Sequence, residues 1–130
     1  MFDNKYRIKT LAKTLLYIFL GGGFGSISRY LVAKFSINTF GTGYSVGTLL
    51  ANILASLILG FVAVKTFESE QIWKPMIAVG FCGGFSTYST FSLELYNHLQ
   101  NAEYGFVLMH IGLNLILCLV AIGLGMMLGR

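Results

Sequence analysis

The sequence YGFVLMHIGLNLILCLVAIGLGMMLG, residues 104–129, contains no charged residue and decides the fold class. A helix needs about 20 mainly apolar residues to cross roughly 30 Å of hydrocarbon. Further uncharged stretches cover residues 35–64 and 75–93, and a shorter one covers residues 14–28. These stretches lack the regular apolar–polar alternation of membrane β-strands. The sequence therefore predicts an all-α membrane protein.

The composition also favours a bilayer. Hydrophobic residues make up 55% of the 130 residues and charged residues 11%, whereas about 25% of a typical soluble domain is charged. A soluble domain this small needs a largely polar surface, so soluble enzymes, soluble nucleic-acid-binding proteins and disordered chains are disfavoured. The net charge of +4 comes from basic residues beside the apolar stretches, and no nucleic-acid partner is expected.

Four membrane-spanning helices are predicted within a single domain that covers residues 1–130. Their predicted ranges are 14–34, 46–65, 75–97 and 105–128. Pro75 suits the first turn of the third helix, where its missing N–H is not needed. Polar loops are expected at residues 36–45, 66–74 and 97–103.

The basic residues indicate the orientation. Four spans place both termini and the 66–74 loop on one side of the membrane. That side carries most of the basic residues, which are Lys5, Arg7, Lys9, Lys13, Lys65, Lys74 and Arg130. The opposite side carries Lys34. The positive-inside rule then predicts that both termini lie in the cytoplasm, in a multi-pass protein of the cell (inner) membrane.

Small residues repeat at four-residue spacing on three of the predicted helices. Such pairs let helix backbones approach closely in lipid. They serve either packing within one four-helix unit or assembly of an oligomer, and we favour the oligomer, since four helices leave little room for an enclosed aqueous path. The pairs are Gly21 and Gly25, Gly22 and Ser26, Ser56 and Gly60, and Gly125 and Gly129.

Polar side chains recur at helical spacing inside two predicted spans, where each needs a partner or a function. Asn52 is the most informative, because its amide offers two donor hydrogens and an acceptor at mid-span. Such stripes either join helices through hydrogen bonds or line a permeation path, and both interpretations stay open. The two stripes, each at i, i+4 and i+8, are Thr48, Asn52 and Ser56, and His110, Asn114 and Cys118.

The third predicted span contains GFCGGFSTYSTFS at residues 80–92. Gly83 and Gly84 each weaken the helix by about 1 kcal/mol relative to alanine, and the hydroxyl residues that follow compete for backbone hydrogen bonds. The sequence therefore predicts a helix that is broken near its middle. Carbonyls freed at such a break suit a small hard cation. The electropositive ring edges of Tyr88 and Phe91, beside hydroxyl donors, suit a small anion.

Residues 80–94 resemble the third-helix signature of the Fluc/CrcB fluoride channel family. GTLLAN at residues 47–52 is similar to the second-helix motif of that family, which carries its pore asparagine. GGGFGSISRY at residues 21–30 is similar to its first-helix glycine-and-arginine motif. The three motifs occur in the order of the family, and the resemblance covers roughly residues 21–129.

The resemblance implies a passive fluoride exporter, built in the lipid membrane as an antiparallel dimer with two pores. By position, Asn52 would donate a hydrogen bond to fluoride in the pore. Tyr88 and Phe91 would occupy the two aromatic positions whose ring edges line it. Thr90 and Asn114 would belong to its hydroxyl-lined polar path.

The family also implies a central structural sodium ion, Na+. The backbone carbonyls of Gly83 and Ser86 from both subunits would hold it. Arg29 and Glu94 would lie near the vestibules of the pore. From the residues alone, Arg29 has a second interpretation, as a side chain that anchors the first helix at the interface.

Three features depart from the family pattern. Tyr88 stands where phenylalanine is usual, and Asn114 and Cys118 stand where relatives often carry serine or threonine. The strong charge bias predicts a fixed orientation, whereas members that insert both ways have nearly balanced ends. The chain could therefore pair with itself in dual topology, or form one half of an oppositely oriented pair.

Two functions from other classes compete with a channel. A small multidrug-type proton-coupled exporter also has four short helices, but it needs a membrane carboxylate, for which Glu94 is the candidate. A helix-packing subunit would explain the glycine pairs but not the stripe at Asn52. An enzyme is not expected, because the sequence offers no nucleophile–base pair and no cluster of metal ligands.

Overall fold

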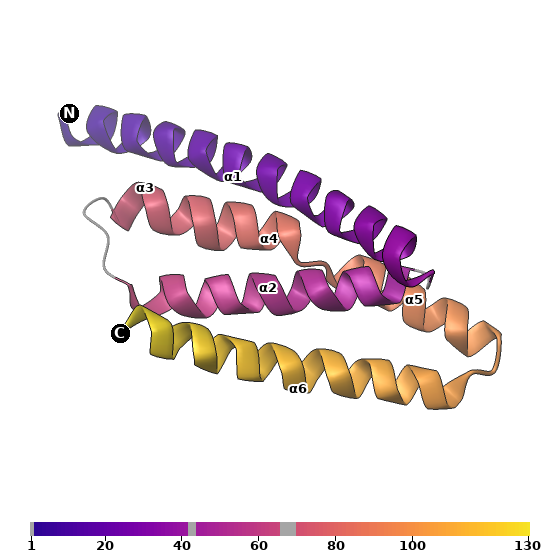
Figure 1. Ribbon diagram of the computed structural model, residues 1–130. Coiled ribbons are helices and arrows are strands. Elements are labelled where there is room, and N and C mark those ends of the chain that lie inside the picture. Colours follow the sequence, from indigo (N-terminus) through magenta and orange to yellow (C-terminus); the bar gives the residue numbers. More distant parts are fainter. Residues whose placement is uncertain (1, 42–43, 66–69) are drawn as a thin grey trace.

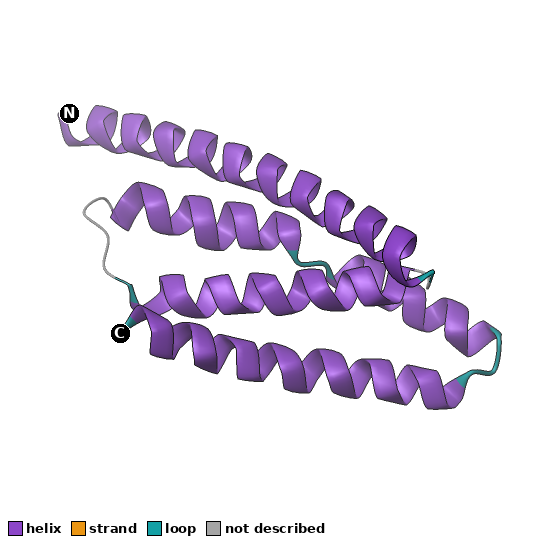
Figure 2. Cartoon of the chain, in the orientation of Figure 1, coloured by secondary structure: helices purple, strands orange, loops and turns teal. Residues whose placement is uncertain are grey.

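The computed structural model describes residues 2–41, 44–65 and 70–130. Every regular element within these residues is helical (Figure 2), which confirms the predicted all-α fold. The elements are α1 (Phe2–Phe40), α2 (Tyr44–Val64), α3 (Glu70–Lys74), the π-helix η1 (Pro75–Phe81), α4 (Cys82–Phe85), α5 (Tyr88–Gln100) and α6 (Tyr104–Gly129).

Three of these helices are long and apolar enough to cross a membrane, judged by length and composition. They cover Tyr6–Phe40, Ser45–Val64 and Tyr104–Gly129. The third predicted span, 75–97, is divided between η1, α4 and α5, and each of these is shorter than a span. Figure 1 shows both chain termini and the beginning of α3 at the same end of the bundle.

The connection predicted at residues 36–45 is largely helical, so that prediction is wrong for most of its length. α1 continues to Phe40, where Gly41 adopts a left-handed φ of 59°. The N–H of Gly41 donates to the carbonyl of Ile37 at 3.1 Å, as expected for a glycine that ends a helix. Continuing the helix keeps backbone groups paired, which lipid demands more strongly than water does. Residues 42 and 43 lie outside the described residues.

Pro75 lies inside a helical segment, although the sequence predicts a helix that begins there. α3, η1 and α4 follow one another without a break, so the segment begins at Glu70. A proline in a helix removes one hydrogen bond and crowds the carbonyl four residues earlier. The wider π-helical turn that starts at Pro75 accommodates this loss. Residues 66–69 of the predicted 66–74 loop lie outside the described residues.

The last predicted loop is shorter than expected. α5 extends through Gln100, and α6 begins at Tyr104, close to the predicted start at residue 105. Between them, Ala102 takes a φ of 57°, and the N–H of Glu103 donates to the carbonyl of His98 at 3.0 Å. The turn thus reverses the chain within three residues and sets α5 beside α6.

Glycines bring α1 into backbone contact with the η1–α4 segment. A methyl group added to Gly21 would collide with the carbonyl of Met76, and one added to Gly25 with the carbonyl of Phe81. From the other side, a methyl group on Gly80 would lie 2.6 Å from the carbonyl oxygen of Ile18. These glycines therefore pack helices within one chain.

Glycines also bring α2 and α6 into backbone contact. Methyl groups on Gly60 and Gly125 would collide with the carbonyls of Ile122 and Leu57, respectively. The small-residue pairs that the sequence analysis assigned to an oligomer are consequently used inside the subunit at these positions. The sequence could not separate the two uses, because close approach of two helices needs the same small residues in either case.

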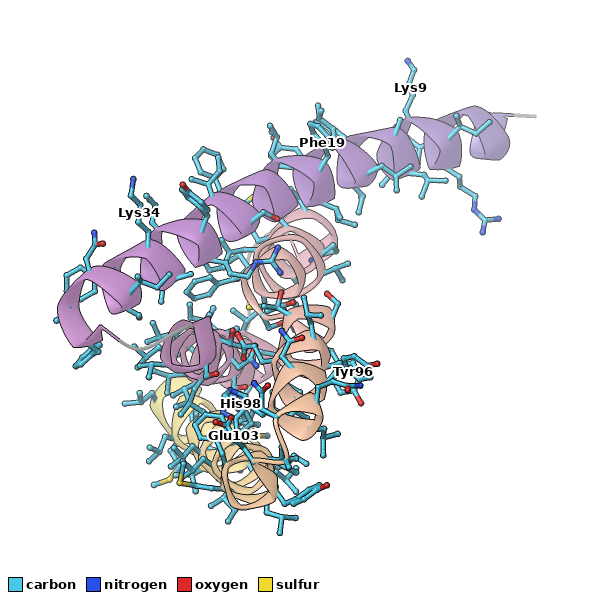
Figure 3. All side chains as sticks on the ribbon, turned by 90° about the vertical axis from the view of Figure 1, so that its right-hand side faces the viewer. Lys9, Phe19, Lys34, Tyr96, His98 and Glu103 are labelled. Carbon is cyan, nitrogen blue, oxygen red and sulfur yellow. The ribbon has the colours of Figure 1, made fainter. Side chains whose placement is uncertain are left out.

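The outer surface of the bundle is apolar. Phe19 on α1 is 76% exposed, and Leu108 and Leu128 on α6 are 73% and 71% exposed. Figure 3 shows Lys9, Phe19 and Lys34 pointing away from the other helices. Exposed apolar faces of this extent suit lipid or a partner subunit and not water.

Candidate functional site

The helical path is interrupted at Ser86 and Thr87. Both residues are extended, with φ and ψ of −75° and 156° for Ser86 and −151° and 120° for Thr87. The Thr87 hydroxyl oxygen accepts from the backbone N–H of Thr90 at 3.2 Å and so caps the beginning of α5. The Ser86 hydroxyl donates to the carbonyl of Cys82 at 2.8 Å. Local hydrogen bonds of Ser and Thr thus stabilise the interruption.

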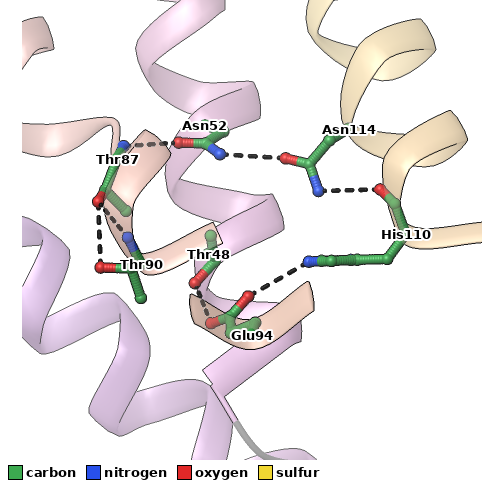
Figure 4. Close-up of polar contacts among 7 residues, drawn as sticks. All are labelled: Thr48, Asn52, Thr87, Thr90, Glu94, His110 and Asn114. Carbon is green, nitrogen blue, oxygen red and sulfur yellow. Dashed lines mark hydrogen bonds and ion pairs between the residues drawn. The ribbon is translucent and has the colours of Figure 1, made fainter. Parts of the chain in front are cut away.

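Asn52 on α2 binds the interrupted backbone directly. The backbone N–H of Thr87 donates to Oδ1 of Asn52 at 2.9 Å. Nδ2 of Asn52 donates to Oδ1 of Asn114 on α6 at 3.0 Å, and Nδ2 of Asn114 donates to the carbonyl oxygen of His110 at 3.2 Å. Figure 4 shows this series, which runs from Thr87, just before α5, through α2 to α6.

Each end of this series fixes the orientation of the amides. A backbone N–H needs an acceptor, so the Asn52 atom that faces Thr87 must be oxygen. A backbone carbonyl needs a donor, so the Asn114 atom that faces His110 must be nitrogen. Each NH2 group then uses one hydrogen within the series, and each keeps a second hydrogen. The arrangement therefore holds two neutral N–H donors with a fixed orientation near the middle of α2 and α6.

A groove of about 530 Å³ lies beside these donors. Its walls come from α2, α5, α6 and the extended residues Ser86 and Thr87. Apolar side chains form most of the lining, and the polar groups gather near the interruption. The residues that line it are Asn52, Ser56, Ser86, Thr87, Tyr88, Phe91, Leu95, Ile111, Asn114, Leu115, Cys118, Leu119 and Ile122.

Four predicted pore residues meet at this groove, and a fifth lies just behind it. Asn52, Tyr88, Phe91 and Asn114 all line it. Thr90 is half-buried, and its Oγ1 lies 3.0 Å from Oγ1 of Thr87. The structure therefore brings the five residues into one region, and their role in conduction stays a prediction.

The two aromatic residues differ in their surroundings. The rings of Tyr88 and Phe91 lie 6.1 Å apart between centroids, at a tilt of 49°. Phe91 packs against the His110 ring, with 5.1 Å between centroids. Tyr88 is 81% exposed and projects from the subunit. The Phe91 ring therefore packs against α6, whereas the Tyr88 ring is free to contact a neighbouring molecule.

Glu94 is buried inside the subunit, and its predicted place near a vestibule of the pore stays a prediction. Oε1 of Glu94 accepts from the Thr48 hydroxyl at 2.5 Å, and Oε2 lies 3.2 Å from Nε2 of His110. Glu94 is 8% exposed and His110 is 3% exposed. A carboxylate can be buried in this way when partners from other helices hydrogen-bond it.

Arg29 is half-buried on α1. The groove is built from α2, α5 and α6, so the structure does not bring Arg29 to the predicted pore residues. Thr87 and His110, by contrast, contact the predicted residues although they were not assigned to the pore. Their backbone N–H and C=O groups orient Asn52 and Asn114, and a side-chain pattern carries no signal for such backbone contacts.

The carbonyls of Gly83 and Ser86 fit the predicted role as sodium ligands. In an uninterrupted helix these carbonyls would accept from the N–H groups of Thr87 and Thr90. Here the two N–H groups donate to Asn52 and to the Thr87 hydroxyl instead. In addition, a methyl group on Gly83 would meet no atom within 4 Å. The interruption thus leaves both carbonyl oxygens without their helical N–H donors, and hard oxygen atoms of this kind suit a small cation.

The sequence is similar to that of known proteins over most of its length. Residues 16–126 match the family described as CrcB-like protein, Camphor Resistance (CrcB). A Coxiella burnetii (strain CbuK_Q154) protein named fluoride-specific ion channel FluC is 33% identical over 120 residues, which are 89% of this chain and 97% of that protein.

Two further relatives carry the same name. The protein of Pyrococcus abyssi is 36% identical over 121 residues, which cover 91% of this chain and 97% of the relative. The protein of Hahella chejuensis is 39% identical over 119 residues, which cover 89% and 94%. Since the family match and these relatives cover most of the sequence, the chain belongs to the CrcB family.

Proposed function

We propose that this chain forms a fluoride-selective channel that exports fluoride passively across the cell membrane and so lowers cytoplasmic fluoride. The observation that carries the proposal is the pair of oriented amides at Asn52 and Asn114, each of which keeps an N–H donor beside the groove. The family relatives named fluoride-specific ion channels support it. Conduction is transport, and no enzymatic step is involved.

The chemistry of the groove favours a small anion. Fluoride holds its hydration water strongly, so a pathway must replace that water with directed donors. Neutral N–H and O–H groups do so without a fixed positive charge that would trap the ion. The ring edges of Phe91 and Tyr88 add weaker positive potential. Thr90 supports Thr87, whose N–H holds the Asn52 amide in its donating orientation.

A second copy of the chain, or an oppositely oriented homologue, completes the pathway. The exposed ring of Tyr88 supports this assembly, because an 81% exposed tyrosine beside a groove needs a neighbour to define its position. An antiparallel dimer would place the interrupted segments of both subunits together. The segment from η1 to α5 then acts as the third of four spans, broken at Ser86 and Thr87.

The backbone carbonyls of Gly83 and Ser86 from each subunit would hold a structural Na+. Such an ion would help to join the two subunits. This proposal is supported by the N–H groups of Thr87 and Thr90, which donate to the side chains of Asn52 and Thr87 and not to these carbonyls. A bound cation at this place would neutralise the partial negative charge of four carbonyls that have lost their helical donors.

The orientation follows from the basic residues of the sequence. Both termini lie in the cytoplasm, and Lys34 lies near the opposite face. Arg29 and Glu94 lie near the vestibules of the pathway. Glu94 also stabilises its wall from inside the subunit, through Thr48 and His110. The proton-coupled exporter is not favoured, because the relatives are named as fluoride channels.

Proteoliposomes that hold the purified protein test the function. Vesicles are loaded with potassium fluoride or potassium chloride, and a potassium ionophore starts the efflux, which ion-selective electrodes record. We expect rapid fluoride efflux and chloride efflux no faster than from protein-free vesicles. Chloride efflux comparable to that of fluoride would refute selectivity, and efflux that requires an imposed proton gradient would favour the exporter.

A further inference from the structure

Two cavities follow one another along α1, and neither shares a lining residue with the groove beside Asn52. The first, which we call the basic pocket, lies near the beginning of α1 and has a volume of about 410 Å³. The second, which we call the lateral groove, lies between α1 and η1 and has a similar volume of about 410 Å³. The basic pocket is lined by Tyr6, Arg7, Thr10, Leu11 and Thr14. The walls of the lateral groove include Tyr17, Leu20 and Phe24 on α1 and Met76, Ile77 and Phe81 on η1.

Helical spacing places both cavities on the same face of α1. Their lining residues recur at steps of three and four, which is the spacing of one helix face. These steps run through Thr10, Thr14, Tyr17, Gly21, Phe24 and Ser28. About one helical turn separates the last residue of the basic pocket from the first residue of the lateral groove. One molecule that lies along α1 can therefore occupy both cavities.

The two cavities differ in chemistry. The guanidinium of Arg7 gives the basic pocket a positive charge, and its planar set of N–H donors matches the oxygens of a phosphate. Within residues 2–41, 44–65 and 70–130, no carboxylate pairs with Arg7. The lateral groove is mainly apolar, and Leu20 and Phe24 in its wall are 44% and 68% exposed. A molecule that fits both cavities is consequently anionic at one end and apolar at the other.

The charges of α1 place the change from polar to apolar at the membrane surface. Residues 14–28 carry no charge, and every α1 residue of the lateral groove falls within them. The groove follows residues 17–28, which is about 17 Å of helix at roughly 1.5 Å per residue. One leaflet contributes about half of a hydrocarbon core that is roughly 30 Å thick. The groove thus has the length of one leaflet, and Arg7 lies before it on the side of the headgroups.

We propose that this face of α1 binds one anionic phospholipid from the leaflet beside the chain termini, which lie at one end of the bundle (Figure 1). Arg7 holds the phosphate in the basic pocket. One acyl chain lies in the lateral groove, between Leu20 and Phe24 on α1 and Ile77 on η1. The site requires insertion in a membrane but not the conduction of fluoride, so it goes beyond the proposed function.

Native mass spectrometry of the purified protein in a neutral detergent tests the site. The protein is titrated with phosphatidylglycerol, and separately with phosphatidylcholine, at about 0.15 M salt to screen distant charges. We expect one phosphatidylglycerol per subunit, and binding of phosphatidylcholine that is at least about tenfold weaker, because its headgroup has no net charge. Glycerol phosphate carries the phosphate but no acyl chain, and we expect that it does not displace the lipid.

Two variants change the basic end of α1. Arg7→Gln removes the guanidinium and should weaken the binding of phosphatidylglycerol at least about tenfold. Lys9→Gln removes the same charge from a side chain that points away from the other helices (Figure 3). As a matched control, it should weaken binding by no more than about threefold.

Two further variants change the apolar end. Leu20→Trp places a larger ring in the lateral groove and should weaken binding by about fivefold or more. Phe19→Trp enlarges the neighbouring ring, which points away from the other helices (Figure 3), and should leave binding unchanged. Size-exclusion chromatography of each variant reports its oligomeric state.

Several results would overturn the proposal. Equal losses in Arg7→Gln and Lys9→Gln would mean general attraction between a basic helix and an anionic lipid. Equal binding of the two lipids, or displacement by glycerol phosphate, would exclude the anionic phospholipid as the specific occupant. Absence of retained phosphatidylglycerol would also overturn it, and a changed oligomeric state of Leu20→Trp would then assign the groove to a second copy of the chain. Failure of the channel function would appear instead as absent fluoride efflux, which none of these measurements reports.

Discussion

Replacing Asn52 by aspartate removes the N–H donor of this side chain and adds a negative charge, while its shape stays nearly the same. The carboxylate keeps an oxygen for the N–H of Thr87, which now donates at 2.9 Å. It exchanges the NH2 group for a second oxygen, which would face Oδ1 of Asn114 at about the present 3.0 Å. If the Asn114 amide rotates to donate to this oxygen, it loses its bond to the carbonyl of His110.

The magnitude follows from two terms. Two unit negative charges about 4 Å apart repel by roughly 4 kcal/mol at an effective dielectric constant of about 20. A lost hydrogen bond to a charged partner costs about 1.5–3 kcal/mol more. Since every 1.4 kcal/mol corresponds to about a tenfold change in rate, even half of the combined penalty predicts a fall of about a hundredfold.

The assay is fluoride efflux from proteoliposomes that contain equal amounts of assembled protein. We expect Asn52→Asp to be reduced to the level of protein-free vesicles. Asn101→Asp makes the same chemical change at an exposed residue in the turn between α5 and α6, and its efflux should equal that of the unmodified protein. An Asn52→Asp protein that conducts within tenfold of the unmodified protein would show that the amide is not a fluoride donor.

Three further predictions concern packing, sodium and orientation. Gly25→Ala should destabilise the contact between α1 and the η1–α4 segment by about 1–3 kcal/mol, because the new methyl group meets the carbonyl of Phe81. The methyl group of Gly23→Ala meets no atom within 4 Å, so this variant should stabilise α1 slightly. Thermal melts that show equal Tm values for the two variants would contradict the packing. The Tm of the purified dimer should rise with sodium concentration and not with equal potassium, and identical melts in both salts would argue against the carbonyl site. Reporters fused to either terminus should signal from the cytoplasm alone, so signal from both sides of the membrane would instead establish dual topology.

The length of the apolar stretches and the helical spacing of polar residues predicted the range of α6 and the helix faces of Asn52 and Asn114. α6 lies close to the predicted range 105–128 because 26 residues without a charge have few other stable states in lipid. The i, i+4 spacing placed Asn52 and Asn114 on defined helix faces, and the structure brings the two amides within 3.0 Å. Local composition also marked the region of the interruption, since Ser86 and Thr87 form backbone contacts there.

Features that depend on contacts between helices could not be predicted from the sequence. The burial of Glu94 requires Thr48 and His110 to arrive from two other helices, and no single-helix pattern reports that. The use of Gly21 and Gly125 inside the subunit depends on which helices are neighbours. Helix ends also shifted where the pairing of backbone groups outweighed local preference, as at the serine- and threonine-rich end of α1.

The reversal potential of the purified protein in a planar bilayer tests the central claim most directly. With fluoride on one side and an equal concentration of chloride on the other, a pathway of oriented neutral donors predicts a current carried by fluoride alone. The reversal potential should then lie far from zero, in the direction set by the fluoride gradient. A reversal potential near zero would mean that chloride passes equally well, and it would contradict the proposed role of the amide-lined groove.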